Sequence, residues 1–330
     1  MKIGVIGCGA LGSYYGALLS RLGEEVHFLA RSDFEVIHQR GVQILTPTGD
    51  FVARPSVAKT PEAIGHCDLM IIGLKTTAND QLPRLLPPML GRHTLVLTLQ
   101  NGLGNEEALA ELVEAERILG GLCFVCLNRI EPGVVRHTGY GHVLLGEFQR
   151  PPQQRTHDLA ALFVRAGVKC SVAENLEEAH WEKLVWNIPF NGLGTASAAG
   201  YDAVVSGEVP ANWRAQPCRT TDLLLDSGSW EELVRELMSE VIRTAQAIGL
   251  GLQASLAEKQ IGRTRSMGAY KPSTLIDYER GKPLEVQTMF LNPLKRAGEL
   301  GVPAPRLQAL ASVLASIDPA RQRAAASPRS

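Results

Sequence analysis

The stretch "KIGVIGCGALG", from Lys2 to Gly12, constrains the fold of this chain more than any other. A short apolar run leads into three glycines with the spacing G-x-G-x-x-G, and a helical pattern follows from Leu11 to Leu22. Gly7 permits a tight turn, Gly9 lets the backbone come close to a ligand, and Gly12 allows close packing of a helix. The stretch therefore predicts a strand, a tight turn and a helix in immediate succession.

The rest of the first half repeats this alternation. The apolar runs "EVHFLA", "DLMIIGL" and "TLVLTL" are separated by helical patterns, one after Ser32 and one after Thr76. Continuous apolar strands separated by helices are typical of a parallel sheet that is covered on both faces. We therefore expect an α/β, Rossmann-type doubly wound sheet over residues 1–174. The stretches "VQILTPTGDFVARPSV" and "GVVRHTGYGHVLLGEF" each predict a β-hairpin.

The pattern changes after Glu174. The segments "EEAHWEKLVWNIPFNGL", "WEELVRELMSEVIRTAQAIGL" and "LEVQTMFLNPLKRAGELG" have helical periodicity with no strand between them. They predict an all-helical domain over residues 175–317. Residues 197–222 are rich in Gly, Pro and Ser and predict a loop or a set of short turns, and residues 318–330 are expected to be a disordered tail.

Composition narrows the class of partner. The formal net charge is −1, which gives no basic footprint for nucleic acid or for an anionic membrane, so the expected partner is a small molecule. No leader of secretory type and no apolar run of about 18 residues occurs, and we expect a cytoplasmic protein. The six cysteines have no framework spacing, and "CFVC" (Cys123 to Cys126) favours buried strand thiols over zinc or redox chemistry. No metal site is expected.

The glycine turn also predicts a cofactor. A helix N-terminus behind a glycine-rich turn attracts a pyrophosphate, because its backbone N–H groups point at the anion. The alternative is a glycine-rich turn that merely packs well. The context of strand, turn, helix and second strand favours a dinucleotide site, whose expected residues are Gly7, Cys8, Gly9, Ala10, Leu11 and Gly12.

The end of the second strand indicates which dinucleotide binds. An Asp or Glu there would accept a hydrogen bond from the 2′-hydroxyl of NAD, but this chain has Ala30, Arg31 and Ser32. A cation at this place suits a 2′-phosphate, so NADP(H) is favoured over NAD(H). Asp33 keeps NAD possible, and Arg31 could also be an ordinary surface charge.

Two further strands end in polar residues. Lys75 follows "DLMIIGL", and Asn101 lies in "LQNGLG" after "TLVLTL". In open α/β sheets, ligands bind outside the carboxyl ends of the strands, so both residues are placed to meet a ligand, and Asn101 lies at the expected nicotinamide end. The alternatives are a solvated lysine and an asparagine that only forms a turn.

In the second half, "WEKLVWNIPFNG" places a polar stripe on an apolar helix. Lys183, Asn187 and Asn191 follow the spacing i, i+4, i+8 and share one helical face. Polar groups in such a setting need partners, and an ammonium held there suits a proton donor. The alternative is a lysine whose amine reaches the surface. Ser273 and Glu285 lie in "KPSTLIDYERGKPLEVQ", where Glu285 could also be a plain acid at a helix start.

Together, "GCGALG", Arg31, Lys75, "QNGLG", "WEKLVWNIPFNGL" and "PSTLIDYERGKPLEV" resemble the ketopantoate reductase (2-dehydropantoate 2-reductase) family, over roughly residues 1–315. The resemblance implies a helical domain of the 6-phosphogluconate dehydrogenase C-terminal type, an active site between the domains, and hydride transfer from NADPH to the C2 carbonyl of 2-dehydropantoate, giving pantoate for coenzyme A biosynthesis. It also implies residue roles.

By this resemblance Lys183 is the proton donor, and Glu285 holds the substrate hydroxyl and the lysine. Asn187 and Asn191 bind substrate, Ser273 receives its carboxylate, and Asn101 is shared by substrate and nicotinamide. Arg31 and Lys75 match the cations on the cofactor side. The roles agree with the chemistry, since carbonyl reduction builds negative charge on an oxygen that an ammonium can stabilise and protonate.

The chain departs from the family in residues 197–222, which are long and polar where further substrate contacts are expected. Two alternatives to ketopantoate reduction therefore stay open. One is a related NADP-dependent 2-hydroxy acid dehydrogenase with another substrate, and the other is a non-catalytic NADP(H)-binding sensor. Lys183 and Glu285 argue against the sensor, because a binding module needs no proton donor. A homodimer formed through an apolar helical face is a further possibility.

Overall fold

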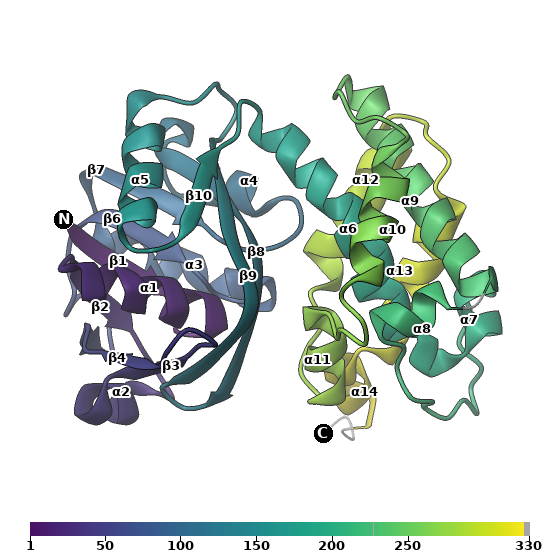
Figure 1. The fold of residues 1–330 in the computed structure, drawn as a ribbon, viewed down its shortest axis with the longest axis horizontal. Coiled ribbons are helices and arrows are strands. Elements are labelled where there is room, and N and C mark those ends of the chain that lie inside the picture. Colours follow the sequence, from purple (N-terminus) through teal and green to yellow (C-terminus); the bar gives the residue numbers. More distant parts are fainter. Residues whose placement is uncertain (227, 327–330) are drawn as a thin grey trace. The chain divides into compact units, whose positions relative to one another are not determined.

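The computed structural model describes residues 1–226 and 228–326 and divides the chain into two compact units, Met1–Ala179 and His180–Ser330 (Figure 1). Helix α6 (Leu176–Ala196) begins next to the predicted change of architecture after residue 174 and carries the chain from the first unit into the second. The helical part thus starts close to the predicted boundary. The boundary between the two compact units, after Ala179, lies a few residues later.

The first unit is built of strands joined by short helices. Its strands are β1 (Lys2–Ile6), β2 (Glu25–Leu29), β3 (Val42–Leu45), β4 (Phe51–Ala53), β5 (Ser56–Ala58), β6 (Cys67–Ile72), β7 (Leu90–Thr98), β8 (Ile118–Glu131), β9 (Val134–Glu147) and β10 (Lys169–Val172). Its α-helices are α1 (Ala10–Leu22), α2 (Phe34–Arg40), α3 (Leu82–Leu85), α4 (Asn105–Ala110) and α5 (Gln154–Arg165), and its 3₁₀ turns are η1 (Thr76–Gln81), η2 (Pro87–Met89) and η3 (Ala115–Arg117).

A run of parallel strands forms the larger part of the sheet and reaches one of its ends, in the order β5, β2, β1, β6, β7 and β8. From β1 the chain first extends the sheet on one side through β2 and β5, and later on the other side through β6, β7 and β8. The strand order therefore reverses between β1 and β6, which is where open α/β sheets bind their ligands. The predicted doubly wound, Rossmann-type sheet is confirmed.

Each face of this sheet has its own apolar core. Leu69 and Ile71 of β6 pack with α1 and α5, whereas Met70 and Ile72 of the same strand pack with α3 and α4. Successive side chains of a strand point to opposite faces, so a strand that is covered on both sides needs apolar residues throughout. This is why the sequence shows continuous apolar runs rather than alternation.

The sheet also curls. β4 and β5 stand at opposite ends of the strand order, yet only Arg54 and Pro55 separate them in the chain. β3 reaches across to pair in parallel with β9, and β4 pairs antiparallel with β3. Helix α1 contacts β2, β3, β4, β8 and β9, so strands surround it on several sides (Figure 1).

One of the two predicted hairpins is confirmed and the other is wrong. β3 and β4 form the first, closed by a hydrogen bond of 2.9 Å from the Thr46 backbone N–H to the Asp50 carboxylate. Val134–Glu147, however, is one strand, β9, which pairs antiparallel with β8 along its whole length. Its glycines flank Tyr140, whose φ is 58°, at a shift in the β8–β9 register. They form a bulge rather than a turn.

The second unit is helical, as predicted. After α6 it contains η4 (Ser197–Ala199), α7 (Tyr201–Ser206), α8 (Thr221–Leu225), α9 (Gly228–Ile248), α10 (Leu256–Arg265), α11 (Ser273–Glu279), the π-helical turn η5 (Gln287–Leu291), α12 (Asn292–Glu299), α13 (Pro305–Ile317) and α14 (Pro319–Ala326). Helix α9 buries Trp230, Leu233, Val234 and Leu237, which is the apolar stripe of an amphipathic helix. None of the helices in the described part of the chain could cross a lipid bilayer by its length and apolar content.

Residues 197–222 fold back on the end of α6. They contain η4 and α7 followed by an irregular stretch. The Gln216 backbone N–H donates to the Ala198 carbonyl at 2.8 Å, and the Arg219 N–H donates to the Gly194 carbonyl at 3.1 Å. The segment is therefore partly helical, and one backbone hydrogen bond, from Arg219 to Gly194, ties its end to α6, while the bond from Gln216 closes it on η4.

The expected disordered tail is wrong for residues 319–326, which form α14. Asp318 accepts a hydrogen bond from the Ala320 backbone N–H at 2.9 Å and so supports the start of the helix. Arg323 Nη1 donates to the Gly281 carbonyl at 2.6 Å. These contacts anchor a segment whose sequence has no apolar side chain larger than proline or alanine, and residues 327–330 lie outside the described residues.

Candidate active site

Three glycines pack tightly where the strand order reverses. Gly7 has a φ of 97°, and a Cβ atom there would collide with the backbone of Leu74. A Cβ on Gly12 would collide with the Gly7 carbonyl oxygen, and one on Gly73 would lie 3.0 Å from the Gly12 Cα. The packing of β1, α1 and β6 therefore requires all three. Sequence reasoning missed Gly73, although its place after "DLMII" was visible.

Gly9 differs from these glycines. Its φ of −78° and ψ of −157° are open to any residue, and a Cβ atom there would meet nothing within 4 Å. No side chain caps α1, and its first turn, which contains Ala10, Leu11 and Gly12, carries no acidic residue. The protein itself does not need a glycine at this position, and the space in front of the helix N-terminus suits an anion.

Cys8, between these glycines, faces the protein. Its Sγ donates to the Leu29 carbonyl of β2 at 3.4 Å. Burial, and to a smaller extent the charge of Asp33, raises the pKa of this thiol. Cys8 therefore stays protonated and helps to pack the turn, and only its backbone is suited to a cofactor.

The other predicted cofactor residues lie along the same edge of the sheet. The last residues of β2, β1, β6 and β7 are in register with one another, so the segments that follow them emerge together. Arg31 follows β2 and is exposed, Lys75 follows β6 and is exposed, and Asn101 follows β7 and is half-buried. The parallel register brings these three residues and the glycine turn to one edge.

A chain of amides links the loops after β6 and β7. Gln100 Nε2 donates to the Asn79 Oδ1 at 2.6 Å and to the Leu74 carbonyl at 3.1 Å. Asn79 Nδ2 donates to Asn105 Oδ1 at 3.2 Å, and Asn105 Nδ2 donates to the Asn101 carbonyl at 3.1 Å. These residues fix the backbone on which Asn101 stands. Sequence reasoning missed them because their partners are far apart in the chain.

Asp33, which left NAD possible, is held by a residue of β8. Arg129 Nε donates to Asp33 Oδ2 at 2.8 Å and Arg129 Nη2 donates to Oδ1 at 2.5 Å. Ser32 Oγ donates to Oδ1 at 2.8 Å, and the Gly133 backbone N–H donates to Oδ2 at 3.2 Å. Both carboxylate oxygens are thus occupied by the protein. Sequence reasoning gave Arg129 no role.

The second unit brings three of its predicted residues together. Asn191 is 2% exposed, and its Oδ1 accepts hydrogen bonds from the Thr274 backbone N–H at 3.0 Å and from Ser273 Oγ at 3.3 Å. Its Nδ2 donates to Asn187 Oδ1 at 3.4 Å. Among the described residues, the buried Asn187 Nδ2 has no hydrogen-bond partner. Helices α6 and α11 therefore present a small polar cluster that contains an unused donor.

Lys183 and Glu285 lie on elements next to this cluster. Lys183 stands one helical turn before Asn187 on α6 and is partly buried, and Glu285, which is 6% exposed, immediately precedes the helical turn into η5. A Cβ on Gly192 would lie 2.9 Å from Phe290 Cε1, so α6 and η5 are in close contact beside the cluster. The predicted contact between Lys183 and Glu285 stays a prediction.

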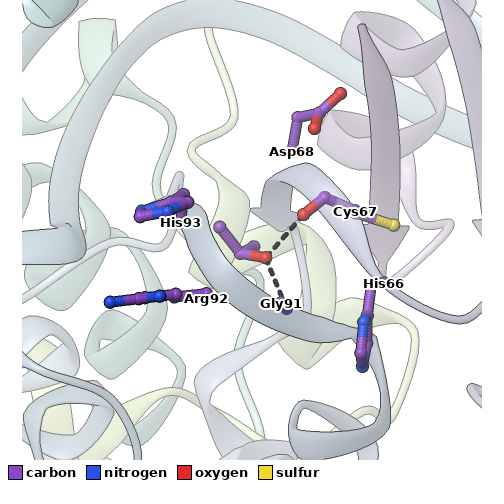
Figure 2. Close-up of a pocket in the computed structure, with 7 residues that line it drawn as sticks. His66, Cys67, Asp68, Gly91, Arg92 and His93 are labelled. Carbon is purple, nitrogen blue, oxygen red and sulfur yellow. Dashed lines mark hydrogen bonds between the residues drawn. The ribbon is translucent and has the colours of Figure 1, made fainter.

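A hollow of about 220 Å³ opens at the other end of the sheet, at the amino ends of β6 and β7 (Figure 2). It is lined by His66, Cys67, Asp68, Gly91, Arg92, His93 and Thr94. Thr94 Oγ1 accepts from the Gly91 N–H at 2.7 Å and donates to the Cys67 carbonyl at 2.5 Å. The hollow contains none of the predicted site residues, and its threonine serves to join the strands.

Cys123 and Cys126 are buried on β8, and the described residues contain no group of three or more His, Cys, Asp or Glu side chains that could hold a metal ion.

Comparison with known proteins agrees with this arrangement. The family model described as Ketopantoate reductase PanE/ApbA matches residues 3–150, and the model for its C-terminal part matches residues 217–318. A 2-dehydropantoate 2-reductase from Nostoc is 38% identical over 96% of this chain and 95% of its own length, and one from Pyrococcus horikoshii is 34% identical over 88% of each. The crystal structure of 2-dehydropantoate 2-reductase from Geobacter metallireducens superposes with a TM-score of 0.88 at 43% identity, covering 96% of this chain and 99% of the other. The chain therefore belongs to the ketopantoate reductase family of oxidoreductases.

Proposed function

We propose that this protein reduces the C2 carbonyl of 2-dehydropantoate to pantoate with NADPH. Membership of the family and the names of its relatives support this activity. The structural observation that carries the proposal is the buried Asn187 Nδ2, which lacks a partner among the described residues, in a cluster where Asn187 and Ser273 are both hydrogen-bonded to Asn191. A buried donor of this kind is rare and suits an acceptor oxygen of a ligand.

The first unit fits an NADP(H) molecule. The open space at Gly9 leaves room for a pyrophosphate at the N-terminus of α1. The exposed Arg31 offers a guanidinium for a 2′-phosphate, and Lys75 adds a second cation at the same edge. Asn101 stands at the nicotinamide end in this proposal. When bound, the reduced nicotinamide supplies the hydride.

The polar cluster of the second unit fits the carboxylate and hydroxyl of the substrate. The Ser273 hydroxyl can turn from Asn191 to a substrate carboxylate without leaving Asn191 unsatisfied, because Asn191 Oδ1 keeps the Thr274 N–H. Asn187 and Ser273 make substrate contacts in this proposal, and Asn191, also predicted to bind substrate, orients both of them through its hydrogen bonds.

Lys183 acts as the acid in the proposed reaction. Negative charge develops on the carbonyl oxygen as the hydride arrives, and an ammonium both stabilises this charge and delivers the proton. In this proposal Glu285 accepts a hydrogen bond from the substrate hydroxyl and also holds the Lys183 amine in place.

Two variants test this assignment. Lys183→Ala is expected to lower kcat by roughly 10²- to 10⁴-fold, the usual contribution of a general acid, and to leave NADPH affinity unchanged. Lys259→Ala removes an exposed lysine from α10 of the same unit and serves as the control. Steady-state NADPH oxidation gives kcat, and nucleotide fluorescence gives the affinity. Unchanged turnover in Lys183→Ala would show that Lys183 is not the acid of the reaction.

The substrate is tested by following NADPH and NADH oxidation with a panel of 2-oxo acids. The panel includes aryl-substituted acids, because D-mandelate dehydrogenase, whose structure was solved with NADH and anilino(oxo)acetate, shares the fold with a TM-score of 0.83 at 20% identity. We expect 2-dehydropantoate with NADPH to give the highest kcat/KM. Turnover of another acid with none of 2-dehydropantoate would reduce the proposal to 2-oxo acid reduction. The cytoplasmic location and the homodimer remain predictions.

A further inference from the structure

Asp33 is the acidic residue nearest in sequence to Arg31, and its position would normally make it a helix cap. It precedes α2, but its side chain makes no capping hydrogen bond. Its two oxygens instead accept four hydrogen bonds, two of them from the guanidinium of Arg129. A carboxylate has about four acceptor sites, so Asp33 has no capacity left for the hydroxyl of a ribose.

The contact is built into the fold of the first unit. Arg129 and Asp33 are 96 residues apart in the chain, and the Asp33 side chain is 6% exposed against 31% for Arg129. A Cβ on Gly133 would lie 3.0 Å from Val36 Cγ1, so the turn between β8 and β9 packs against α2. The hairpin therefore carries Arg129 to Asp33 and holds the segment that contains Arg31.

The net charge of the segment that contains Arg31 and Asp33 decides which nucleotide it attracts. An unpaired Asp33 would cancel the charge of Arg31, repel a phosphate and offer acceptor oxygens to a 2′-hydroxyl. Burial raises the pKa of Asp33, but the hydrogen bonds from Arg129, Ser32 and Gly133 outweigh it and hold the pKa below its usual value. The carboxylate thus stays ionised while its charge is compensated from β8.

We propose that Arg129 is a positioning residue that sets the cofactor preference: by occupying Asp33, it leaves Arg31 as the effective charge at the end of β2 and so favours the 2′-phosphate of NADP(H) over the 2′-hydroxyl of NAD(H). The inference rests on the proposed use of NADPH. It assigns the discrimination to Arg129 and Asp33, which act through Arg31 and do not themselves contact the phosphate.

The test measures the affinities of the full-length protein for 2′,5′-ADP and 5′-AMP by calorimetry, which needs no turnover. In Arg129→Met, we expect the preference for 2′,5′-ADP to fall at least about tenfold, because Asp33 loses its hydrogen bonds from the guanidinium. A tenfold change is about the contribution of one hydrogen bond to a charged group. Asp33→Asn should keep the preference, and the double variant Asp33→Asn/Arg129→Met should restore it. The ratio of kcat/KM for NADPH and NADH should follow the same order.

The outcomes separate the two proposals. If the wild-type protein binds the two nucleotides equally well, the proposed preference for NADPH is wrong, and this inference is wrong with it. A wild-type preference that survives Arg129→Met overturns the inference alone. A double variant that stays unselective also overturns it, because Arg129 would then bind the phosphate itself. If Arg129→Met does not fold, Arg129→Lys, which cannot form the two-pronged contact, must lower the preference, and loss of preference in Asp33→Asn overturns the inference.

Discussion

Substituting Gly9 by alanine separates a cofactor site from a glycine turn that merely packs well. The new methyl group would meet no protein atom within 4 Å, and the backbone conformation is open to alanine. The remaining effect on folding is the exchange of glycine for alanine at a helix N-cap, about 1 kcal/mol or less. For a unit of this size, the melting temperature should fall by no more than about 4 °C.

Cofactor binding should respond very differently. The methyl group would fill the space in which a pyrophosphate meets the N-terminus of α1, so we expect the Kd for NADPH to rise at least tenfold, equivalent to about 1.4 kcal/mol. The assay pairs thermal unfolding of the free protein with a fluorescence titration of NADPH. Wild-type affinity in Gly9→Ala would refute the placement of the cofactor at this turn.

Gly12→Ala is the matched comparison. Its methyl group would collide with the Gly7 carbonyl oxygen and lie 3.1 Å from Val5 Cγ1. Such overpacking costs about 1–3 kcal/mol, so this variant should lose stability as well as affinity. An equal fall of the melting temperature in Gly9→Ala and Gly12→Ala would show that the open space at Gly9 has been misjudged.

Three further predictions concern other parts of the chain. Asn187→Leu should lower the free energy of unfolding by about 1–3 kcal/mol in urea titrations, because the buried Asn191 Nδ2 loses its acceptor, while removal of the unused Asn187 donor lowers kcat/KM for the oxo acid. Asn79→Ala should raise the KM for NADPH, because it cuts the amide chain between the loops after β6 and β7, and it should lower the melting temperature, because the buried Asn105 Oδ1 loses its donor; an unchanged KM would contradict the positioning role. Burial raises the pKa of Glu147, but hydrogen bonds from Arg155 and Thr156 outweigh it and hold the pKa below its usual 4.5. The stabilisation from this carboxylate is therefore present above pH 4.5 and lost as the pH falls through the lower folded-state pKa, and Glu147→Gln should flatten that part of the stability profile in urea titrations.

Much of this architecture could be predicted because it depends on the local periodicity of apolar residues in the sequence. Continuous apolar runs indicated a sheet covered on both faces, and the parallel register then brings Arg31, Lys75 and Asn101 to one edge. The stripe of Asn187 and Asn191 followed from helical spacing alone. The family resemblance assigned Ser273 to the same substrate, but the hydrogen bond between Ser273 and Asn191 was not predicted.

The parts that could not be predicted depend on distant partners. Nothing near Asp33 in the sequence points to Arg129, which reaches it only through the β8–β9 hairpin. The glycines of β9 read as a turn because bulges and turns use the same residues, and only the pairing with β8 distinguishes them. Helix α14 depends on contacts with residue 281, which local composition cannot reveal.

The curled sheet also affects how the chain can fold during synthesis. Ile44 of β3 is in register with Val135 of β9, so the hairpin of β3 and β4 has no neighbour on one side until the ribosome has made roughly 100 more residues, about 5–20 s at ordinary elongation rates. During that time an unpaired strand edge is exposed to other nascent chains. A message truncated before β9 would leave this edge open permanently, and its product would be prone to aggregate.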